Sequence, residues 1–165
     1  MPTNPLAEIF RYNKWANSTL LDACRTLSDD QLDATIPGSS SIRETLTHIV
    51  GGQQTFVLRT VGRQHEGELS RHSPWPGFDT LVELATTSSD ELIAIAESLN
   101  EDEEVDLTYL GKTHRFPKSF FLAHAIAHST QHREQVLLTL VSLGVDPPDL
   151  DGWPYASAAG HGQEV

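Results

Sequence analysis

The stretch HAIAHSTQHREQV, residues 124–136, decides the architecture of this chain. Its histidines, His124, His128 and His132, recur every four residues. On an α-helix this spacing rotates successive side chains by about 40° and raises them by about 6 Å, so they share one face. Apolar residues flank the histidines at helical spacing: Phe121, Leu122, Ala125, Ile126, Val136, Leu137, Leu140 and Leu143. The pattern predicts a long helix whose histidines border a helical core.

The N-terminal segment carries the signals of another helix. Asn4 followed by Pro5 is typical of an N-cap and a first helical residue. Apolar residues then recur with helical spacing, at Leu6, Ile9, Phe10, Leu20 and Leu21. We therefore expect a helix from about Pro5 to Leu27.

A capping box marks the start of the next helix. Residues 36–40 have the composition of a loop, and Ser41 and Glu44 follow at the spacing at which each side chain satisfies a backbone N–H of the other residue. The helix should therefore begin near Ile42, and His48 then falls in its second turn.

The middle of the chain predicts a third helix and a short hairpin. Residues 62–77, with several glycines and prolines, look like a long connection, and apolar spacing indicates a helix over 81–99, although the polar segment 86–89 interrupts it. The acidic run 101–104 is typical of a solvated turn. Alternation over 105–116 around Gly111 then predicts a hairpin.

A last helix should run from about Pro117 to Gly144, and Pro147 and Pro148 follow it. We therefore expect an all-α protein, a four-helix bundle with a short hairpin before the last helix. At 165 residues the chain suits a single domain, 1–165, with an irregular C-terminal tail from about residue 145.

Composition limits the classes of binding partner and the cellular compartment that we expect for this chain. A formal net charge of −12 and the lack of a basic stripe argue against a nucleic-acid partner. No apolar run is long enough for a membrane span, and the segment 1–4 does not resemble a signal peptide. Cys24 is the single cysteine, and it cannot form an internal disulfide. We expect a cytoplasmic protein with no membrane partner.

The histidine pattern predicts a site for one divalent metal ion. Two imidazoles from one helix can reach one ion, as either His124 with His128 or His128 with His132, and the spacing does not choose between the pairs. A third ligand must come from elsewhere, and His48 is the candidate on another helix, although a lone histidine is more often a hydrogen-bonded residue. Glu44 could also ligate, but its capping-box position already explains it.

The chain resembles the DinB/YfiT-like family of four-helix metalloproteins. The resemblance rests on five segments in this order: YNKWAN at 12–17, SIRETLTHI at 41–49, HAIAHSTQHREQV at 124–136, Leu143-Gly144, and PPDLD at 147–151 with Trp153. It implies an up-down-down-up bundle, usually a homodimer, with zinc, nickel or a similar divalent ion on three histidines. Those ligands fall on His48, His128 and His132, and His124 becomes a neighbour. Glu134 departs from the family pattern, in which a glycine commonly follows His-Arg.

The resemblance also implies a function. The family's characterised activities are transfers or isomerisations that depend on a low-molecular-weight thiol, which the metal holds as a thiolate. We therefore expect a metal-dependent S-transferase or isomerase acting on a small-molecule substrate, with no organic cofactor. A metal-dependent hydrolase and a non-enzymatic, metal-stabilised ligand-binding protein are the alternatives.

Several residues near these segments are weaker candidates. His124 is expected to orient or pack against the site more than to react. Glu134, Trp153 and Tyr155 could shape a pocket mouth. Cys24 lies in an apolar helical run, so we expect it to be a core residue and not a nucleophile.

Overall fold

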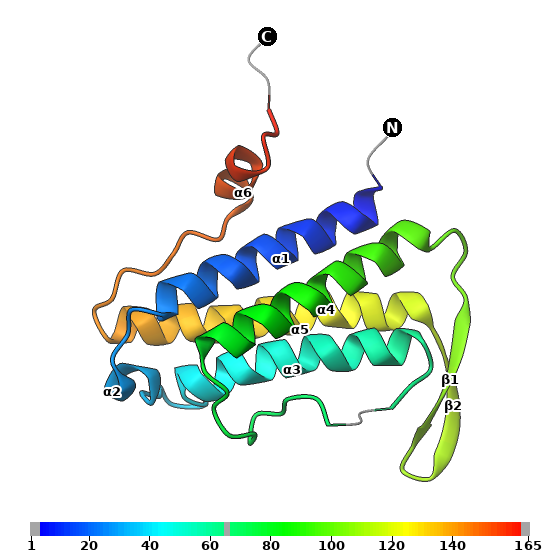
Figure 1. Ribbon diagram of the computed structural model, residues 1–165, viewed down its shortest axis with the longest axis horizontal. Coiled ribbons are helices and arrows are strands. Elements are labelled where there is room, and N and C mark those ends of the chain that lie inside the picture. The colour runs from blue at the N-terminus through cyan, green and yellow to red at the C-terminus, as the bar shows by residue number, and fades with distance from the viewer. Residues whose placement is uncertain (1–3, 65–66, 163–165) are drawn as a thin grey trace.

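The computed structural model of the chain describes residues 4–64 and 67–162. Its elements are α1 (Pro5–Cys24), α2 (Asp29–Leu32), α3 (Ile42–Thr60), α4 (Phe78–Ser98), β1 (Glu104–Tyr109), β2 (Lys112–Pro117), α5 (Lys118–Ser142) and α6 (Gly152–Ala158). The long helices α1, α3, α4 and α5 form a bundle, and the hairpin β1–β2 lies at one end of it (Figure 1). The predicted helical bundle with a hairpin before its last long helix is confirmed.

The directions of the helices explain the lengths of their connections. Helices α1 and α5 run one way along the bundle, and α3 and α4 run the other way (Figure 1). Because α3 and α4 are parallel, the chain between them, residues 61–77, must return along the bundle. Helix α1 packs mainly against α4, and α3 packs mainly against α5. This is the up-down-down-up order, and it places the histidine-bearing helices α3 and α5 side by side.

Both predicted N-caps are present. The Asn4 side-chain oxygen accepts a hydrogen bond from the backbone N–H of Leu6 at 2.9 Å. Glu44 Oε2 accepts from the backbone N–H of Ser41 at 3.1 Å, and Ser41 Oγ accepts from the backbone N–H of Glu44 at 3.2 Å. This capping box fixes the start of α3 and therefore places His48 in its second turn.

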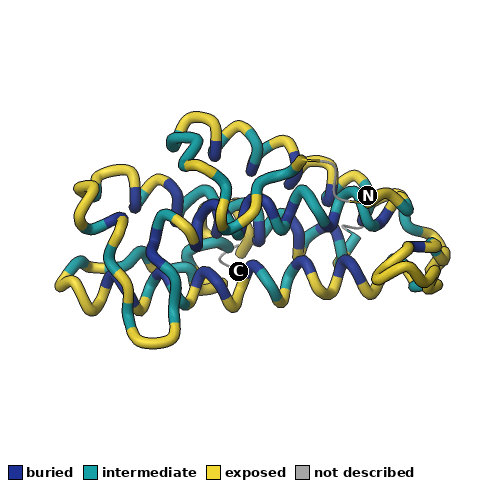
Figure 2. The backbone as a smooth tube through the Cα atoms, turned by 90° about the horizontal axis from the view of Figure 1, so that it is seen from below, coloured by how far each residue is buried: buried dark blue, intermediate teal, exposed yellow. Residues whose placement is uncertain are grey.

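Two apolar clusters fill the bundle. The cluster near α2 includes Leu20, Ile42, Leu46, Leu81 and Leu140. The cluster near the hairpin includes Phe10, Phe56, Leu92, Phe121 and Leu122. Buried residues recur along the long helices, whereas most of the hairpin is exposed (Figure 2).

A belt of buried polar side chains crosses the bundle between these clusters. Arg133 of α5 donates to Asn13 Oδ1 at 2.6 Å and to Asn17 Oδ1 at 2.8 Å, both on α1. Asn17 donates to Gln53 Oε1 of α3 at 2.9 Å, and Gln53 donates to the Ser88 hydroxyl of α4 at 2.8 Å. The members of this polar belt are Asn13, Asn17, Gln53, Ser88, Ser89 and Arg133. The belt ties all the long helices together.

The first helix is shorter than predicted. Helix α1 ends at Cys24 and not at Leu27, and the short helix α2 follows. Ser28 caps α2 by a second capping box with Gln31. The backbone of Ser28 is extended, with φ −71° and ψ 163°, so the first helix cannot continue through it.

The C-terminal tail, predicted to be irregular, contains helix α6. Asp151 caps this helix by accepting from the backbone N–H of Trp153 at 3.1 Å. The ring of Tyr155 packs with its centroid 5.4 Å from that of Tyr12 and 5.6 Å from that of Trp15. The aromatic surface of α1 thus supports α6, which the local pattern of the tail does not reveal. Trp15 is thereby partly covered within the chain.

Two smaller expectations also change. The polar segment 86–89 does not interrupt α4, because Ser88 and Ser89 are buried and bond to the polar belt. Glu104 begins β1 instead of belonging to a turn, and it pairs with Pro117 in the antiparallel register.

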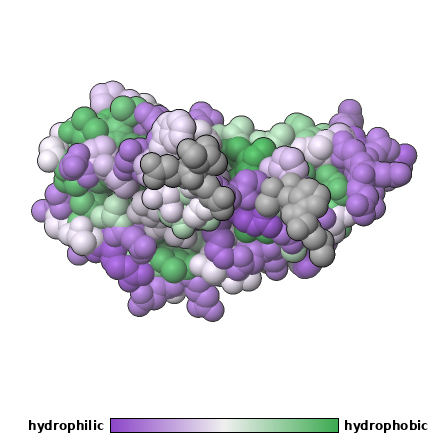
Figure 3. Space-filling view, turned by 90° about the horizontal axis from the view of Figure 1, so that it is seen from above, coloured by the Kyte–Doolittle hydropathy of each residue, from purple (hydrophilic) through white to green (hydrophobic). Residues whose placement is uncertain are grey.

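The outer surface of the bundle is mixed. Within the described ranges, no helix combines the length and the apolar character needed to cross a bilayer. Figure 3 shows hydrophilic and hydrophobic residues interspersed on one face, with a hydrophilic region at the hairpin end.

Candidate metal centre

Helices α3 and α5 bring three histidines together. His48 comes from α3, and His128 and His132 come from successive turns of α5. One nitrogen from each ring lies within 4.8 Å of the other two, and the Nε2 atoms of His48 and His128 are 3.0 Å apart. Neighbouring nitrogen ligands of a tetrahedral zinc ion stand about 3.3 Å apart, since each lies about 2.0–2.1 Å from the metal. This histidine cluster therefore offers the donor type that a divalent ion needs, at a similar spacing.

The histidine cluster does not satisfy its own hydrogen-bonding capacity. Among the described residues, Nδ1 of His128 is buried without a hydrogen-bond partner. The ring centroids of the cluster lie only 4.4 to 4.7 Å apart. Each neutral imidazole has one N–H and one lone pair to satisfy, and an unpaired buried polar atom costs about 1–3 kcal/mol. A cation that accepts one lone pair from each ring fits the close approach of the Nε2 atoms of His48 and His128, and His128 would then carry its hydrogen on Nδ1.

A hydrogen bond orients the ring of His132. Its Nδ1 lies 2.7 Å from Oε1 of Gln135, one turn further along α5. An amide oxygen can only accept, so Nδ1 carries the hydrogen and Nε2 keeps its lone pair. Metal-ligating histidines commonly donate their other ring N–H in this way, which fixes the tautomer.

Two consecutive glycines of α3 make room around the cluster. A Cβ atom at Gly52 would lie 2.5 Å from Cε1 of His128, so glycine lets that ring rest against α3. A Cβ atom at Gly51 would lie 1.7 Å from the backbone oxygen of Leu69, so glycine also lets the connection 61–77 pass close to the helix. A glycine inside a helix costs about 1 kcal/mol relative to alanine. Close packing around the cluster explains why α3 carries two.

Burial keeps two of the imidazoles neutral. It lowers the pKa of His48 from its ordinary value of 6.5 to about 4, with smaller contributions from nearby His132, Arg71 and His72. Burial, and then the neighbouring His132, lower the pKa of His128 to about 3. Near pH 7 both rings are therefore uncharged, as a metal ligand must be.

A pocket of about 300 Å³ opens beside the cluster. His48 and His128 line it, whereas His132 is only 8% exposed. The other lining residues belong to α3, the connection 61–77 and α5: Gly51, Gly52, Thr55, Phe56, Arg59, Leu69, Ser70 and His124. A small molecule can reach the cluster through this histidine pocket.

Comparison of the sequence with known protein families identifies the family of this chain. The sequence pattern of the DinB family matches residues 1–164. The chain belongs to the DinB family. No curated protein sequence matches it.

Two solved structures share the DinB bundle. A DinB-like protein of Bacillus cereus matches with a TM-score of 0.65 at 23% identity, covering 87% of this chain and 94% of that chain. A DinB-like protein of Bacillus subtilis matches with a TM-score of 0.59 at 21% identity, covering 87% of this chain and 98% of that chain. At these identities the likeness concerns the fold, so the case for a metal centre depends on this chain's own histidines.

In this DinB-family chain His124 lies next to the cluster and outside it. Its ring centroid is 6.2 Å from that of His128 and 4.6 Å from that of Phe56. Partial burial, and then the charge of Arg59, lower the pKa of His124. The geometry favours the role of neighbour that the family resemblance implies.

The weaker sequence candidates lie elsewhere. Glu134 lines a different pocket together with Asp149, and Tyr155 donates a hydrogen bond to Glu8 on α1. Trp153 is 84% exposed. None of Glu134, Trp153 and Tyr155 is among the described residues that line the histidine pocket.

Cys24 is a core residue, as predicted. Its side chain is fully buried in the apolar cluster near α2, and burial raises the pKa of its thiol to about 12. A thiol with such a pKa is not ionised near neutral pH, so Cys24 is no nucleophile.

Sequence reasoning missed several residues that shape the site. Gly51 and Gly52 carried a usable signal, because two glycines inside a helix, three and four residues after His48, indicate close packing on the same face. Gln135 stands three residues after His132, within reach on one helical face. Arg59 carried no such signal, since only the folded chain brings it beside His124.

Proposed function

We propose that this chain is a metal-dependent enzyme in which His48, His128 and His132 hold one divalent ion, zinc or nickel, and that it joins a small thiol to an electrophilic small molecule or isomerises such a molecule. The observation that carries the proposal is the histidine cluster, with its close ring nitrogens beside an open pocket. DinB-family membership supports it.

The donor set suits a reactive site more than a structural one. Structural zinc sites usually fill all four positions with protein ligands, whereas catalytic sites keep one position for water or substrate. Within the described residues, the candidate group comprises the histidines alone. A divalent ion held there supplies positive charge that lowers the pKa of a thiol or water molecule at the open position.

The protein's own residues have distinct tasks in this proposal. Gln135 holds His132 in one tautomer through Nδ1. Gly52 lets His128 lie against α3. His124, which lines the histidine pocket and has a lowered pKa, can accept the proton that a bound thiol releases.

The reaction class needs a direct test. Protein purified without added metal or chelator is incubated with a panel of small thiols and an aryl halide electrophile, and thioether formation is measured. We expect turnover that chelation abolishes and zinc or nickel restores. Thiol transfer balances as follows: a sulfur–carbon bond forms, the carbon–halogen bond breaks, and halide and a proton are released.

The control separates the cluster from other histidines. His114→Ala on the exposed hairpin should keep the activity, whereas His128→Ala should lose it. If the protein hydrolyses an ester in a metal-dependent reaction that needs no thiol, it is a hydrolase and not the proposed transferase. Metal-loaded protein that turns over neither class of substrate would contradict an enzymatic role.

A further inference from the structure

A second pocket adjoins the histidine pocket. It has a volume of about 420 Å³ and lies between the hairpin and the nearby ends of α3 and α5. Arg59 and His124 line both pockets. A ligand in this second space, the hairpin pocket, can therefore lie next to one at the histidine cluster. The two volumes are within the range that holds small molecules.

The walls of the hairpin pocket are largely aromatic. Phe116 of β2 and Phe120 and Phe121 of α5 line it, and the centroid of Phe116 lies 5.5 Å from that of Phe120 and 5.4 Å from that of Phe121. Leu107, whose side chain is buried, adds an aliphatic wall from β1. Offset and edge-to-face contacts with such rings favour a flat apolar group.

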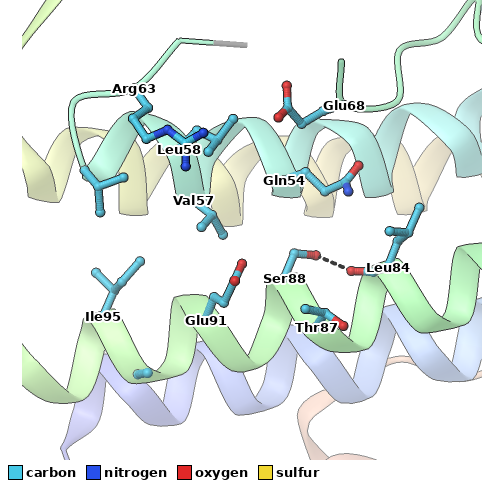
Figure 4. A pocket seen from close by; sticks show the side chains of 12 residues that line it. Gln54, Val57, Leu58, Arg63, Glu68, Leu84, Thr87, Ser88, Glu91 and Ile95 are labelled. Carbon is cyan, nitrogen blue, oxygen red and sulfur yellow. Dashed lines mark hydrogen bonds between the residues drawn. The ribbon is translucent and has the colours of Figure 1, made fainter. Parts of the chain in front are cut away.

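Among the described residues, the side chains that line these pockets include arginines. In the described part of the chain, no aspartate or glutamate lines either the histidine pocket or the hairpin pocket, although the sequence has 23 acidic residues. The groove between α3 and α4 differs, since Glu68 and Glu91 lie at its walls (Figure 4). Arg63 lines both the groove and the hairpin pocket, so the two differ in the carboxylates of Glu68 and Glu91, which a carboxylate ligand would meet only at the groove.

Arg59 supplies the complementary charge. Its side chain is partly buried, and its guanidinium carbon lies 5.8 Å from the ring centroid of Phe56. Stacking against an aromatic face restrains the guanidinium, and its planar N–H fork matches both oxygens of a carboxylate. Arg59 stands where the two pockets meet, so it can hold an acid group next to the cluster.

We propose that the hairpin pocket binds an aryl or arylalkyl carboxylate, with its ring among Phe116, Phe120 and Phe121 and its carboxylate on Arg59. One part of this inference rests on the proposed function: a ligand of this class that also carries a halogen would be the electrophilic substrate. A sulfur–carbon bond would then form at the carbon that bears the halogen, the carbon–halogen bond would break, and halide and a proton would be released. The binding itself requires the hairpin pocket and Arg59, and not the metal.

The test compares two ligands that differ in charge. Binding of 3-phenylpropionate and of its neutral amide is measured by calorimetry on the parent, on Arg59→Gln and on Arg25→Gln. Arg25 is the matched control, since its guanidinium carbon lies 5.6 Å from the ring centroid of Phe78 in a similar stack at the C-terminal end of α1, and it lines neither pocket. We expect Arg59→Gln to weaken binding of the acid about tenfold to a hundredfold and to leave the amide unchanged. Arg25→Gln should alter neither.

A second variant tests the aromatic wall. Phe120→Ala should weaken binding of the acid and of the amide by a similar factor, because it removes contacts with the phenyl ring that both ligands have. Equal affinity of the parent for acid and amide, or no effect of Arg59→Gln, would overturn the proposal.

Repeating the titration after chelation distinguishes this proposal from the proposed function. We expect the acid to bind metal-free protein with the same dependence on Arg59. Binding that vanishes with the metal would make the acid a metal ligand and contradict the proposal. Arg59-dependent binding without any thiol transfer to an aryl carboxylate electrophile would retain the ligand site and reject its role in the proposed reaction.

Discussion

The polar belt and the histidine cluster differ in how completely their buried polar atoms are hydrogen-bonded within the protein. They meet on α5, where His132 and Arg133 are neighbours in sequence and both are buried. In the belt, Arg133 donates to Asn13 and Asn17, and the bonds continue to α3 and α4. In the cluster, His128 retains a buried nitrogen with no partner among the described residues.

This difference suggests different roles for two polar groups in one core. Buried polar groups in native proteins are almost always hydrogen-bonded, so a network that closes on itself can serve the fold without a ligand. A buried group that stays open calls for a water molecule or an ion. We therefore assign the polar belt to stability and the histidine cluster to binding, and the predictions below test that division.

Breaking the polar belt should have the largest effect. Arg133→Met removes the donor of three hydrogen bonds, to Asn13, Asn17 and Thr130, and leaves the buried oxygens of Asn13 and Asn17 without that donor. The free energy of unfolding should fall by about 2–5 kcal/mol, measured by urea denaturation, because each buried oxygen left without a donor costs about 1–3 kcal/mol. Arg115→Gln, which breaks an exposed hairpin salt bridge with Asp106, should cost far less. Equal losses would show that the belt has no special structural role.

Crowding the cluster should have a smaller and more local effect. Gly52→Ala places a Cβ atom 2.5 Å from Cε1 of His128 and must displace that ring. Metal affinity, measured by competition with a chelator, should fall about tenfold to a hundredfold. Gly152→Ala is the matched control, because a Cβ there meets nothing within 4 Å. Unchanged affinity in Gly52→Ala would mean that the position of the ring does not matter for binding.

The smallest effect should be the pH dependence of metal-free protein between pH 7 and pH 6. Folding lowers the pKa of His48 to about 4 and of His128 to about 3, whereas the unfolded values are near 6.5. The unfolded chain therefore binds more protons over this range, so the free energy of unfolding should fall as the pH falls. His128→Leu should reduce that slope, and His114→Ala should change it less. An identical slope in His128→Leu would contradict the lowered pKa.

Local signals were enough to predict much of the fold. Asn4 and Ser41 marked helix starts because a cap depends on residues only a few positions apart. The four-residue spacing of His128 and His132 likewise reports a shared helical face. Ser28 was overlooked in the same kind of reasoning, although its capping box with Gln31 was visible in the sequence.

Long-range contacts explain what the sequence pattern did not reveal. Helix α6 is supported by aromatic residues of α1 that lie more than a hundred positions away. The bonds of Arg133 to Asn13 and Asn17 span similar separations. The helical wheel did not decide whether His124 or His132 joins His128 as a ligand. The third ligand, His48, lies 80 positions from His128, so only the folded chain brings the two together.

The most direct test of the account is a metal titration of the chelated protein, in the parent, His124→Ala and His128→Ala. We predict about one zinc or nickel ion per chain in the parent and in His124→Ala, and no stoichiometric binding in His128→Ala, because the site needs one lone pair from each of three imidazoles. Circular dichroism should first show that both variants are folded. Stoichiometric metal in His128→Ala, or its complete loss in His124→Ala, would contradict the assignment of the ion to His48, His128 and His132.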